Sequence, residues 1–294
     1  MRHRGAGKRL IDAAFFAAGL ALLGAGWEAY KAVGPANGGK VLGWRILPRT
    51  ENTAMPHVVD MFRAFAKPEV RGSSRSIISV VATGAWFSGR MALAGLFLGV
   101  VIGIALAIVM ARFKVAERGL LPYVVLSQTV PLIALAPLVV SWGGKLKIGG
   151  LTWQRWMSAA AISAFLAFFP IVIGALRGLT SPSPAALELM DSYAAPWWKT
   201  LLKLRLPSSV PYLVPALKLA ASSAVVGTIV AEISTGLRGG IGRLIIEYSQ
   251  EGTSQPAKVF TALFGAAALG LAMAGLIALI DAFASRHRPS EASA

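Results

Sequence analysis

The sequence predicts an all-α integral membrane protein with about six transmembrane helices. Three observations point to this class: 55% of the 294 residues are hydrophobic, only 14% are charged, and the mean hydropathy is +0.64. Soluble domains usually carry about 25% charged residues. Because the apolar residues here gather in long runs, the deficit of charge indicates helices that face lipid.

Six apolar segments of about 20 residues each can be placed along the chain. At about 1.5 Å per residue, each could cross a hydrocarbon core of about 30 Å. Backbone polar groups in lipid must bond internally, so we expect helices rather than open strands. The segments are 11–33, 91–111, 121–142, 157–177, 209–233 and 259–282.

These segments give a predicted organisation of the chain. A signal peptide at the start is the alternative to a first span, but the apolar run is longer than the apolar region of such peptides, which favours an uncleaved helix. An amphipathic helix is expected within 56–65, where apolar residues have helical spacing. The predicted parts are a tail at 1–10, a first helix at 11–33, an outer segment at 34–90, a core of five helices at 91–282 containing a polar connection at 185–207, and a tail at 283–294.

Lysine and arginine counts predict the orientation. With both termini in the cytoplasm, the inner segments hold 13 of these residues and the two short outer loops hold 6. The outer segment 34–90 holds eight more, but segments of about that length fall outside the rule. We therefore expect a multi-pass protein of the bacterial inner membrane with both termini cytoplasmic.

The net charge of +16 does not indicate nucleic-acid binding, because the basic residues are scattered through short connections between apolar runs. Membrane flanks collect Lys and Arg, which also attract anionic lipid head groups. The chain has no cysteine and only three histidines, so no metal site is expected. No arrangement of nucleophile and base and no phosphate-binding loop is visible, so we expect neither an enzyme nor a bound cofactor.

The connection after the fourth span has the composition of a helix, a turn and a second short helix. The turn falls at Ala195-Pro196, and leucines alternate with Lys199, Lys203 and Arg205 beyond it. Exposed apolar residues on a cytoplasmic helix pair usually need a partner surface. A helix that rests on lipid is the alternative, and the physical pattern alone leaves the two open.

Here the sequence resembles the permeases of bacterial ABC importers, and specifically the nitrate/sulfonate/taurine branch. Glu188 matches the glutamate of their "EAA" loop, Ala194 stands where glycine is usual, and Leu204-Arg205-Leu206-Pro207 matches the closing motif. Leu189-Met190 replaces the usual Ala-Ala. Two further stretches agree in order and spacing, around 121–138 and 225–242, and the resemblance covers about residues 75–282.

The resemblance implies the type I importer permease fold with a cytoplasmic coupling helix. It also implies partners: two cytoplasmic ATP-binding subunits, a second permease subunit of the same or a homologous kind, and an extracytoplasmic binding protein that delivers solute. The ATPase would dock on the 185–207 segment. The residues expected to carry this coupling are Glu188, Leu189, Met190, Ala194, Ala195, Pro196, Leu206 and Pro207.

Polar and proline residues inside apolar spans are candidates for the solute path, since such residues are costly in lipid. Interhelical hydrogen bonding is the alternative for Ser127, Gln128 and Thr129, helix capping and local salt bridging for Glu232, and snorkelling for Lys218. The candidates are Ser127, Gln128, Thr129, Pro131, Lys218 and Glu232.

The expected function is therefore that of a non-catalytic permease subunit for a small anionic or zwitterionic solute, such as nitrate, a sulfonate, taurine, or a pyrimidine or vitamin precursor. An ATP-independent secondary transporter or channel is the alternative, although such proteins commonly contain inverted repeats. No convincing repeat relates 11–142 to 157–282. A membrane scaffold that recruits a soluble partner is a second alternative.

Overall fold

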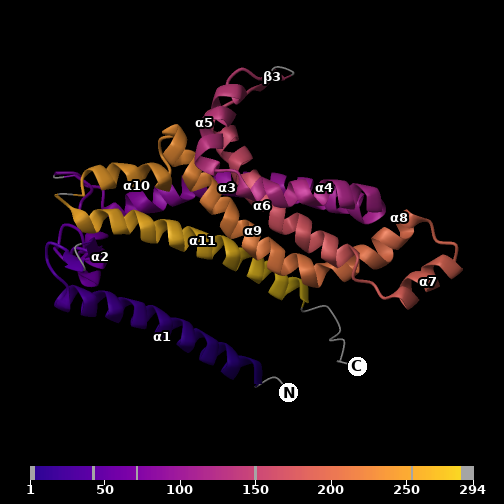
Figure 1. Cartoon of the computed structure of the whole chain (residues 1–294), viewed down its shortest axis with the longest axis horizontal. Coiled ribbons are helices and arrows are strands. Elements are labelled where there is room, and N and C mark those ends of the chain that lie inside the picture. The colour runs from indigo at the N-terminus through magenta and orange to yellow at the C-terminus, as the bar shows by residue number, and fades with distance from the viewer. Residues whose placement is uncertain (1–3, 42–43, 71, 149–150, 253, 286–294) are drawn as a thin grey trace. The chain divides into compact units, whose positions relative to one another are not determined.

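The computed structural model describes residues 4–41, 44–70, 72–148, 151–252 and 254–285, and this part of the chain is mostly helical (Figure 1). Residues 1–3 and 286–294 of the two predicted tails lie outside the described residues. The helices are α1 (Arg4–Val33), α2 (Val58–Ala64), α3 (Ile77–Arg112), α4 (Lys114–Leu126), α5 (Leu132–Gly143), α6 (Arg155–Leu179), α7 (Pro184–Ser192), α8 (Trp197–Thr200), α9 (Leu206–Thr235), α10 (Ile241–Gln250) and α11 (Pro256–Ser285).

Short irregular elements connect these helices. A 3-10 turn, η1 (Ser127–Thr129), separates α4 from α5, and a π-helical turn, η2 (Leu201–Arg205), joins α8 to α9. Two small antiparallel hairpins complete the described structure. Their strands are β1 (Gly39–Val41), β2 (Trp44–Leu47), β3 (Lys147–Ile148) and β4 (Leu151–Thr152).

Within the described residues, four helical stretches are long and apolar enough to cross a membrane. They are Ile77–Arg112, Arg155–Leu179, Trp197–Thr235 and Pro256–Phe283. The bent pair formed by Lys114–Thr129 and Leu132–Gly143 is a fifth if it is counted as one span. The segment expected at 11–33 lies in the 30-residue helix α1. The class of multi-pass helical membrane protein is therefore confirmed, and the count of six spans stays a prediction.

The chain divides into two compact units. Unit 1 comprises residues 1–80 and 247–263, and unit 2 comprises residues 81–246 and 264–294. In unit 1 the end of α1 is tied to the segment that follows it. Glu28 accepts hydrogen bonds from the Val58 backbone N–H at 2.7 Å and pairs with His57 Nδ1 at 2.8 Å, and the Trp27 indole donates to the Pro56 carbonyl at 3.0 Å. Residues 56–58 of the predicted outer segment thus contact the end of the first helix.

Unit 1 also contains a buried lysine at the start of α11. Lys258 Nζ donates to Glu251 Oε2 at 2.6 Å and to the Glu69 carbonyl at 2.9 Å, and it lies 4.4 Å from the centre of the Tyr248 ring. Burial, followed by the charges of nearby glutamates, raises the pKa of the Tyr248 phenol, so this ring is neutral at any physiological pH. The cluster therefore ties α10, the loop after it and the segment before α3 together.

Unit 2 is built around the antiparallel pair α6 and α9, which lie side by side. Small residues allow this close approach: a Cβ at Gly178 would lie 2.6 Å from the Ser209 Cα, and one at Gly227 would lie 2.8 Å from the Ser163 Cα. The buried Ser163 hydroxyl also donates across the pair to the Ala224 carbonyl at 2.8 Å. Close helix contact through small residues and an interhelical hydrogen bond is typical of membrane bundles.

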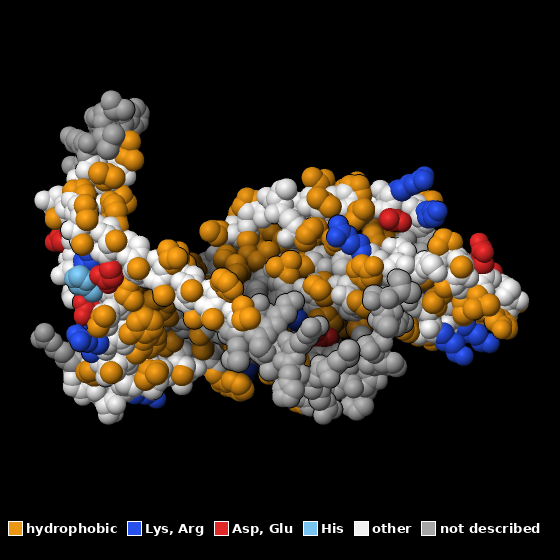
Figure 2. All heavy atoms as spheres, turned by 90° about the horizontal axis from the view of Figure 1, so that it is seen from below, with side chains coloured by type: hydrophobic (Ala, Val, Ile, Leu, Met, Phe, Trp, Pro, Cys, Tyr) orange, Lys and Arg blue, Asp and Glu red, His pale blue; other side chains and the backbone are white. Residues whose placement is uncertain are grey.

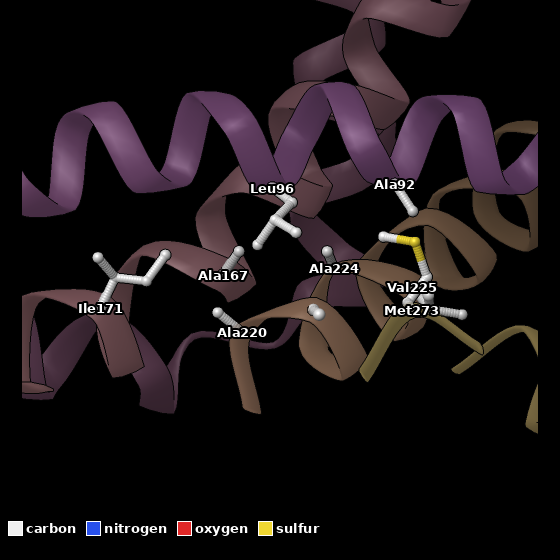
Figure 3. Packing of buried hydrophobic residues seen from close by; sticks show 9 residues of the cluster. Ala92, Leu96, Ala167, Ile171, Ala220, Ala224, Val225 and Met273 are labelled. Carbon is white, nitrogen blue, oxygen red and sulfur yellow. The ribbon is translucent and has the colours of Figure 1, made fainter. Parts of the chain in front are cut away.

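Residues from α3 and α11 complete the core of unit 2 around that pair. Figure 3 shows Leu96 and Ala92 of α3 pointing towards the small residues of α6 and α9, with Met273 of α11 below Ala92 in this view. The nine buried residues of this cluster are Ala92, Leu96, Ala167, Ile171, Ala220, Ala221, Ala224, Val225 and Met273. Five of the nine are alanines, so the packing depends on backbone proximity rather than on large side chains.

Three expected boundaries differ from the structure. The second helix begins at Ile77 rather than near residue 91, because the apolar run that leads into the span contains no proline to end a helix. The expected third span, 121–142, bends by 102° where η1 meets Pro131. Proline lacks the N–H needed to continue a helix and disfavours helical conformation in the residue before it, and Val130 is accordingly extended at φ −74°, ψ 126°.

The third difference lies at the fifth span. The second short helix expected after Ala195-Pro196 does not end before the span, because α8, η2 and α9 form one continuous helical stretch from Trp197 to Thr235. The π-helical turn lies directly before Pro207. A proline cannot donate to the carbonyl four residues earlier, and a π-turn is one way to accommodate it.

Candidate functional site

The α7–α8 segment lies beyond the ends of α6 and α9 in unit 2 (Figure 1). Its first helix begins with a strong signal: the Ser183 hydroxyl accepts from the Ala186 N–H at 3.3 Å, and Pro184 occupies the first turn. A capping serine followed by proline is a preferred helix start. The start of α7 is therefore determined by its own local residues rather than by packing against other helices.

The end of α7 is a Schellman motif. The Ala195 N–H donates to the Met190 carbonyl at 3.0 Å, the Ala194 N–H donates to the Asp191 carbonyl at 2.9 Å, and Ala194 has φ +47°. This motif needs one residue in the left-handed conformation, which is usually glycine. The geometry explains why glycine is usual at this position in the resembling permeases, and it shows that alanine holds the same turn here at a cost in backbone strain.

We expect Ala194→Gly to stabilise the chain by about 0.5–1 kcal/mol, because glycine adopts this φ without the clash of a Cβ. The greater conformational freedom of glycine in the unfolded chain offsets part of that gain. The matched control is Ala195→Gly, whose position has no positive φ and which should therefore destabilise by a similar amount. Chemical unfolding of both variants in detergent measures the difference. Equal destabilisation by the two substitutions would contradict the strained turn.

Side chains in the second half of the α7–α8 segment anchor it to the body of unit 2. The Trp197 ring lies 5.1 Å below the Arg112 guanidinium at the end of α3, and Leu201 is buried beside α6. Arg205 Nη1 donates to the Leu179 carbonyl at 2.8 Å, which occupies an otherwise open acceptor at the end of α6. A displacement of α8 would therefore also displace the adjoining ends of α3, α6 and α9.

The same segment exposes large apolar side chains. The exposed fractions are 56% for Leu189, 76% for Tyr193, 64% for Trp198 and 63% for Leu202. Charged side chains also gather towards this end of unit 2 in Figure 2, whereas hydrophobic side chains are more frequent along the helices away from this end. Exposed apolar residues with charges around them are typical of a surface that receives another protein.

The structure places six of the eight predicted coupling residues in the α7–α8 segment. Glu188, Leu189, Ala194 and Pro196 are exposed, while Met190 and Ala195 are half-buried. Leu206 and Pro207 lie further on, where η2 passes into α9. The last two are thus part of the connection to the span rather than of the exposed turn.

The candidate path residues do not form one cluster. Ser127 and Thr129 donate to the Val124 and Leu126 carbonyls of their own helix end at 2.7 and 2.8 Å, so their hydroxyls are satisfied locally at the bend. Gln128 is exposed beside them. Lys218 is half-buried in α9, and in the described part of the chain no hydrogen bond or ion pair joins its side chain to the bend.

Glu232 has the structural environment of a helix cap. It is fully buried, its Oε2 accepts from the Gly242 N–H at 2.7 Å, and its Oε1 accepts from the Ser88 hydroxyl at 2.7 Å. The Ser88 oxygen in turn accepts from the Ile241 N–H at 2.9 Å. This network satisfies the first N–H groups of α10 and joins α3, α9 and α10, which is the capping role that the sequence left open.

Ser88 is the residue of this network that sequence reasoning missed. It lies 144 residues before Glu232, and a lone serine in an apolar helix carries no signal. The glycines that follow Glu232 do carry a sequence signal. In the structure a Cβ at Gly240 would overlap the Glu232 carboxyl group. Adjacent glycines after a buried acidic residue indicate close backbone approach.

Comparison with known proteins identifies the family. Residues 99–290 match the family described as "Binding-protein-dependent transport system inner membrane component". The chain is 33% identical over 173 residues to the formylaminopyrimidine transport permease protein ThiX of Halalkalibacterium halodurans, covering 58% of this chain and 65% of that protein.

Two further relatives carry different substrate names. The putative aliphatic sulfonates transport permease protein SsuC of Bacillus subtilis is 27% identical over 187 residues, covering 64% of this chain and 63% of that protein. The riboflavin transport system permease protein RibX of Chloroflexus aurantiacus is 28% identical over 180 residues, covering 61% and 63%. The matches thus span slightly less than two thirds of each of these relatives.

The family match covers more than half of the chain, and it contains the bent α4–α5 pair, the α6–α9 pair and the α7–α8 segment. The relatives are named as transport permeases, and ATP hydrolysis in such systems belongs to a separate ATPase. The prediction of a non-catalytic permease of the nitrate/sulfonate type is therefore confirmed. The chain belongs to the family of binding-protein-dependent transport system inner membrane components, the permease subunits of ABC importers.

Proposed function

We propose that this chain forms the membrane path of an ATP-driven importer for a small anionic or zwitterionic solute. The α7–α8 segment is the observation that carries the proposal: it exposes apolar side chains, and Arg205 and Trp197 tie it to the ends of α6 and α3. An element of this kind can convert the movement of a docked ATPase into movement of the spans.

The remaining partners are part of the same proposal. A second permease subunit would complete the path, and an extracytoplasmic binding protein would deliver solute. The relatives are named as transporting formylaminopyrimidine, aliphatic sulfonates and riboflavin, respectively. For this chain we propose a solute of similar small size, with nitrate, taurine and vitamin precursors as the classes to screen.

The test is uptake by proteoliposomes that contain this chain, its ATPase and its binding protein. Uptake should require ATP in the compartment that contains the ATPase subunits, and it should persist when ion gradients are abolished. Gln128→Leu, at the exposed bend, should change solute affinity or the uptake rate with the complex intact. Gln250→Leu, the same substitution at an exposed position of α10, is the matched control and should leave uptake unchanged. Uptake driven by an ion gradient alone would support the secondary-transporter alternative.

The proposed topology places both termini and the α7–α8 segment in the cytoplasm, with unit 1 segments 34–76 and 251–255 outside. The chain has no cysteine, so single substitutions report cleanly. In intact cells a membrane-impermeant maleimide should label Ser254→Cys and should leave Ser192→Cys unlabelled until the membrane is opened; both serines are exposed. Labelling of Ser192→Cys from outside would overturn the orientation.

A further inference from the structure

A cavity of about 490 Å³ lies in unit 2 at the end remote from α7. It is formed by the N-terminal half of α3, the start of α6 and the turn after α9. Arg112, at the far end of α3, contacts α8, and 22 residues separate it from Arg90 of the cavity. At about 1.5 Å per residue, the cavity lies roughly 33 Å along α3 from the coupling segment.

Two arginines line this cavity: Arg90 of α3 and Arg155 at the first position of α6. Within the described residues neither is joined to an acidic side chain, and Arg90 instead lies 5.6 Å from the Phe87 ring centre. Both guanidinium groups line the same cavity, and the positive end of the 25-residue helix α6 adds to the positive potential there. An oxyanion bound in the cavity could form charge-assisted hydrogen bonds with these groups.

The rest of the cavity wall is largely apolar. Phe87, Met91, Leu237 and the 41% exposed ring of Trp156 contribute to it. The Trp156 indole donates to Gln154 Oε1 at 2.8 Å, which fixes the ring at the rim. Ligand sites typically have volumes of about 300–1,000 Å³ and apolar walls with a few placed polar groups, and this cavity has both properties.

The wall is also held in place before any ligand arrives. Gly239 has φ +101°, and a Cβ at that position would lie 3.7 Å from the Phe87 ring, so the turn after α9 lies directly against this ring. The hydrogen bonds from Ser88 and Gly242 to Glu232 hold the same turn to α3 and α9. A preformed wall lowers the entropic cost of binding.

We propose that this cavity binds an organic anion: a sulfonate, carboxylate or phosphate group between Arg90 and Arg155, with its apolar part against Phe87 and Trp156. The anion has two possible sources, a free solute or the head group of an anionic lipid. As a site for a transported solute, the inference rests on the proposed function. The binding measurement needs neither ATPase nor uptake, so its failure would be distinguishable from failure of the proposed function.

The test uses the full chain in nanodiscs of zwitterionic phosphatidylcholine and equilibrium binding of tritiated naphthalene-2-sulfonate, which stays ionised at every working pH. Saturable binding is expected, and the neutral naphthalene-2-sulfonamide should bind at least about 10-fold more weakly. Arg90→Gln and Arg155→Gln should each weaken sulfonate binding about 10-fold. Arg118→Gln, an exposed arginine of α4 at the opposite end of α3, is the matched control and should leave binding unchanged.

Unchanged melting temperatures and elution profiles would show that the variants are folded, which is expected because both arginines are exposed. Adding phosphatidylglycerol to the nanodiscs distinguishes the sources. An Arg-dependent loss of sulfonate affinity in its presence assigns the site to a head group, and unchanged affinity assigns it to a free solute. No saturable binding, equal binding of the neutral probe, or binding unaffected by both arginine substitutions would overturn the proposal.

Discussion

Glu188→Arg is expected to weaken association of the permease with its ATPase about 30-fold and to lower solute-stimulated ATP hydrolysis and uptake together. The side chain is exposed on α7, and in the described part of the chain it has no hydrogen bond or ion pair. Its replacement should therefore leave the permease itself intact. Disruption of a central contact in such an interface commonly costs about 2 kcal/mol, which corresponds to roughly 30-fold in affinity.

Glu51→Arg is the matched control for this substitution. It makes the same change of charge at an exposed position, but in the segment of unit 1 that we place on the other side of the membrane. Co-purification from detergent and ATPase assays of the reconstituted complex measure the effect. The basal activity of the isolated ATPase should be unchanged, because that subunit carries no substitution.

Shape can be tested separately from charge at the turn. Ala194→Trp should block close approach at the Schellman turn, whereas Ala194→Gly should preserve both the turn and the coupling. If Glu188→Arg and Ala194→Trp both assemble with a full complement of ATPase and transport normally, the segment is better described as a helix pair resting on lipid.

The spans were predictable because they depend on a property that the sequence displays directly. An apolar run of about 20 residues must be helical in lipid, and α6 follows the expected segment 157–177 to within two residues at each end. Hydropathy alone did not place the start of α3 at Ile77, since an apolar run longer than about 20 residues does not show where within it the helix begins.

The site was predictable only where local chemistry defines it. Ser183, Pro184 and Pro196 mark the starts of α7 and α8 in the sequence, so the pattern of two short helices joined by a turn was visible. The bonds from Arg205 to the Leu179 carbonyl and from Ser88 to Glu232 join residues 26 and 144 positions apart. Such pairings follow from the packing of α3, α6 and α9, and no single sequence pattern encodes them.

Glu232→Ala is expected to destabilise unit 2 by about 3 kcal/mol. The substitution leaves the buried Gly242 N–H and the Ser88 hydroxyl without their acceptor, and each unsatisfied buried group costs about 1–3 kcal/mol. Glu232→Gln should lose about half as much, because its amide retains one acceptor oxygen. Thermal unfolding in detergent and hydrogen exchange at the Ile241 and Gly242 amides measure the two effects.

A second substitution tests whether the carboxyl group and the glycine turn act as one unit. Gly240→Ala alone should be strongly destabilising, since its Cβ would overlap the Glu232 carboxyl group. In the Glu232→Ala background that space is vacant, so the same Gly240→Ala change should cost much less, and the two effects should be non-additive. Glu188→Ala, at an exposed position of α7, is the control for loss of a glutamate. Unchanged stability of Glu232→Ala together with a selective loss of solute uptake would reject the cap and assign Glu232 to the path instead.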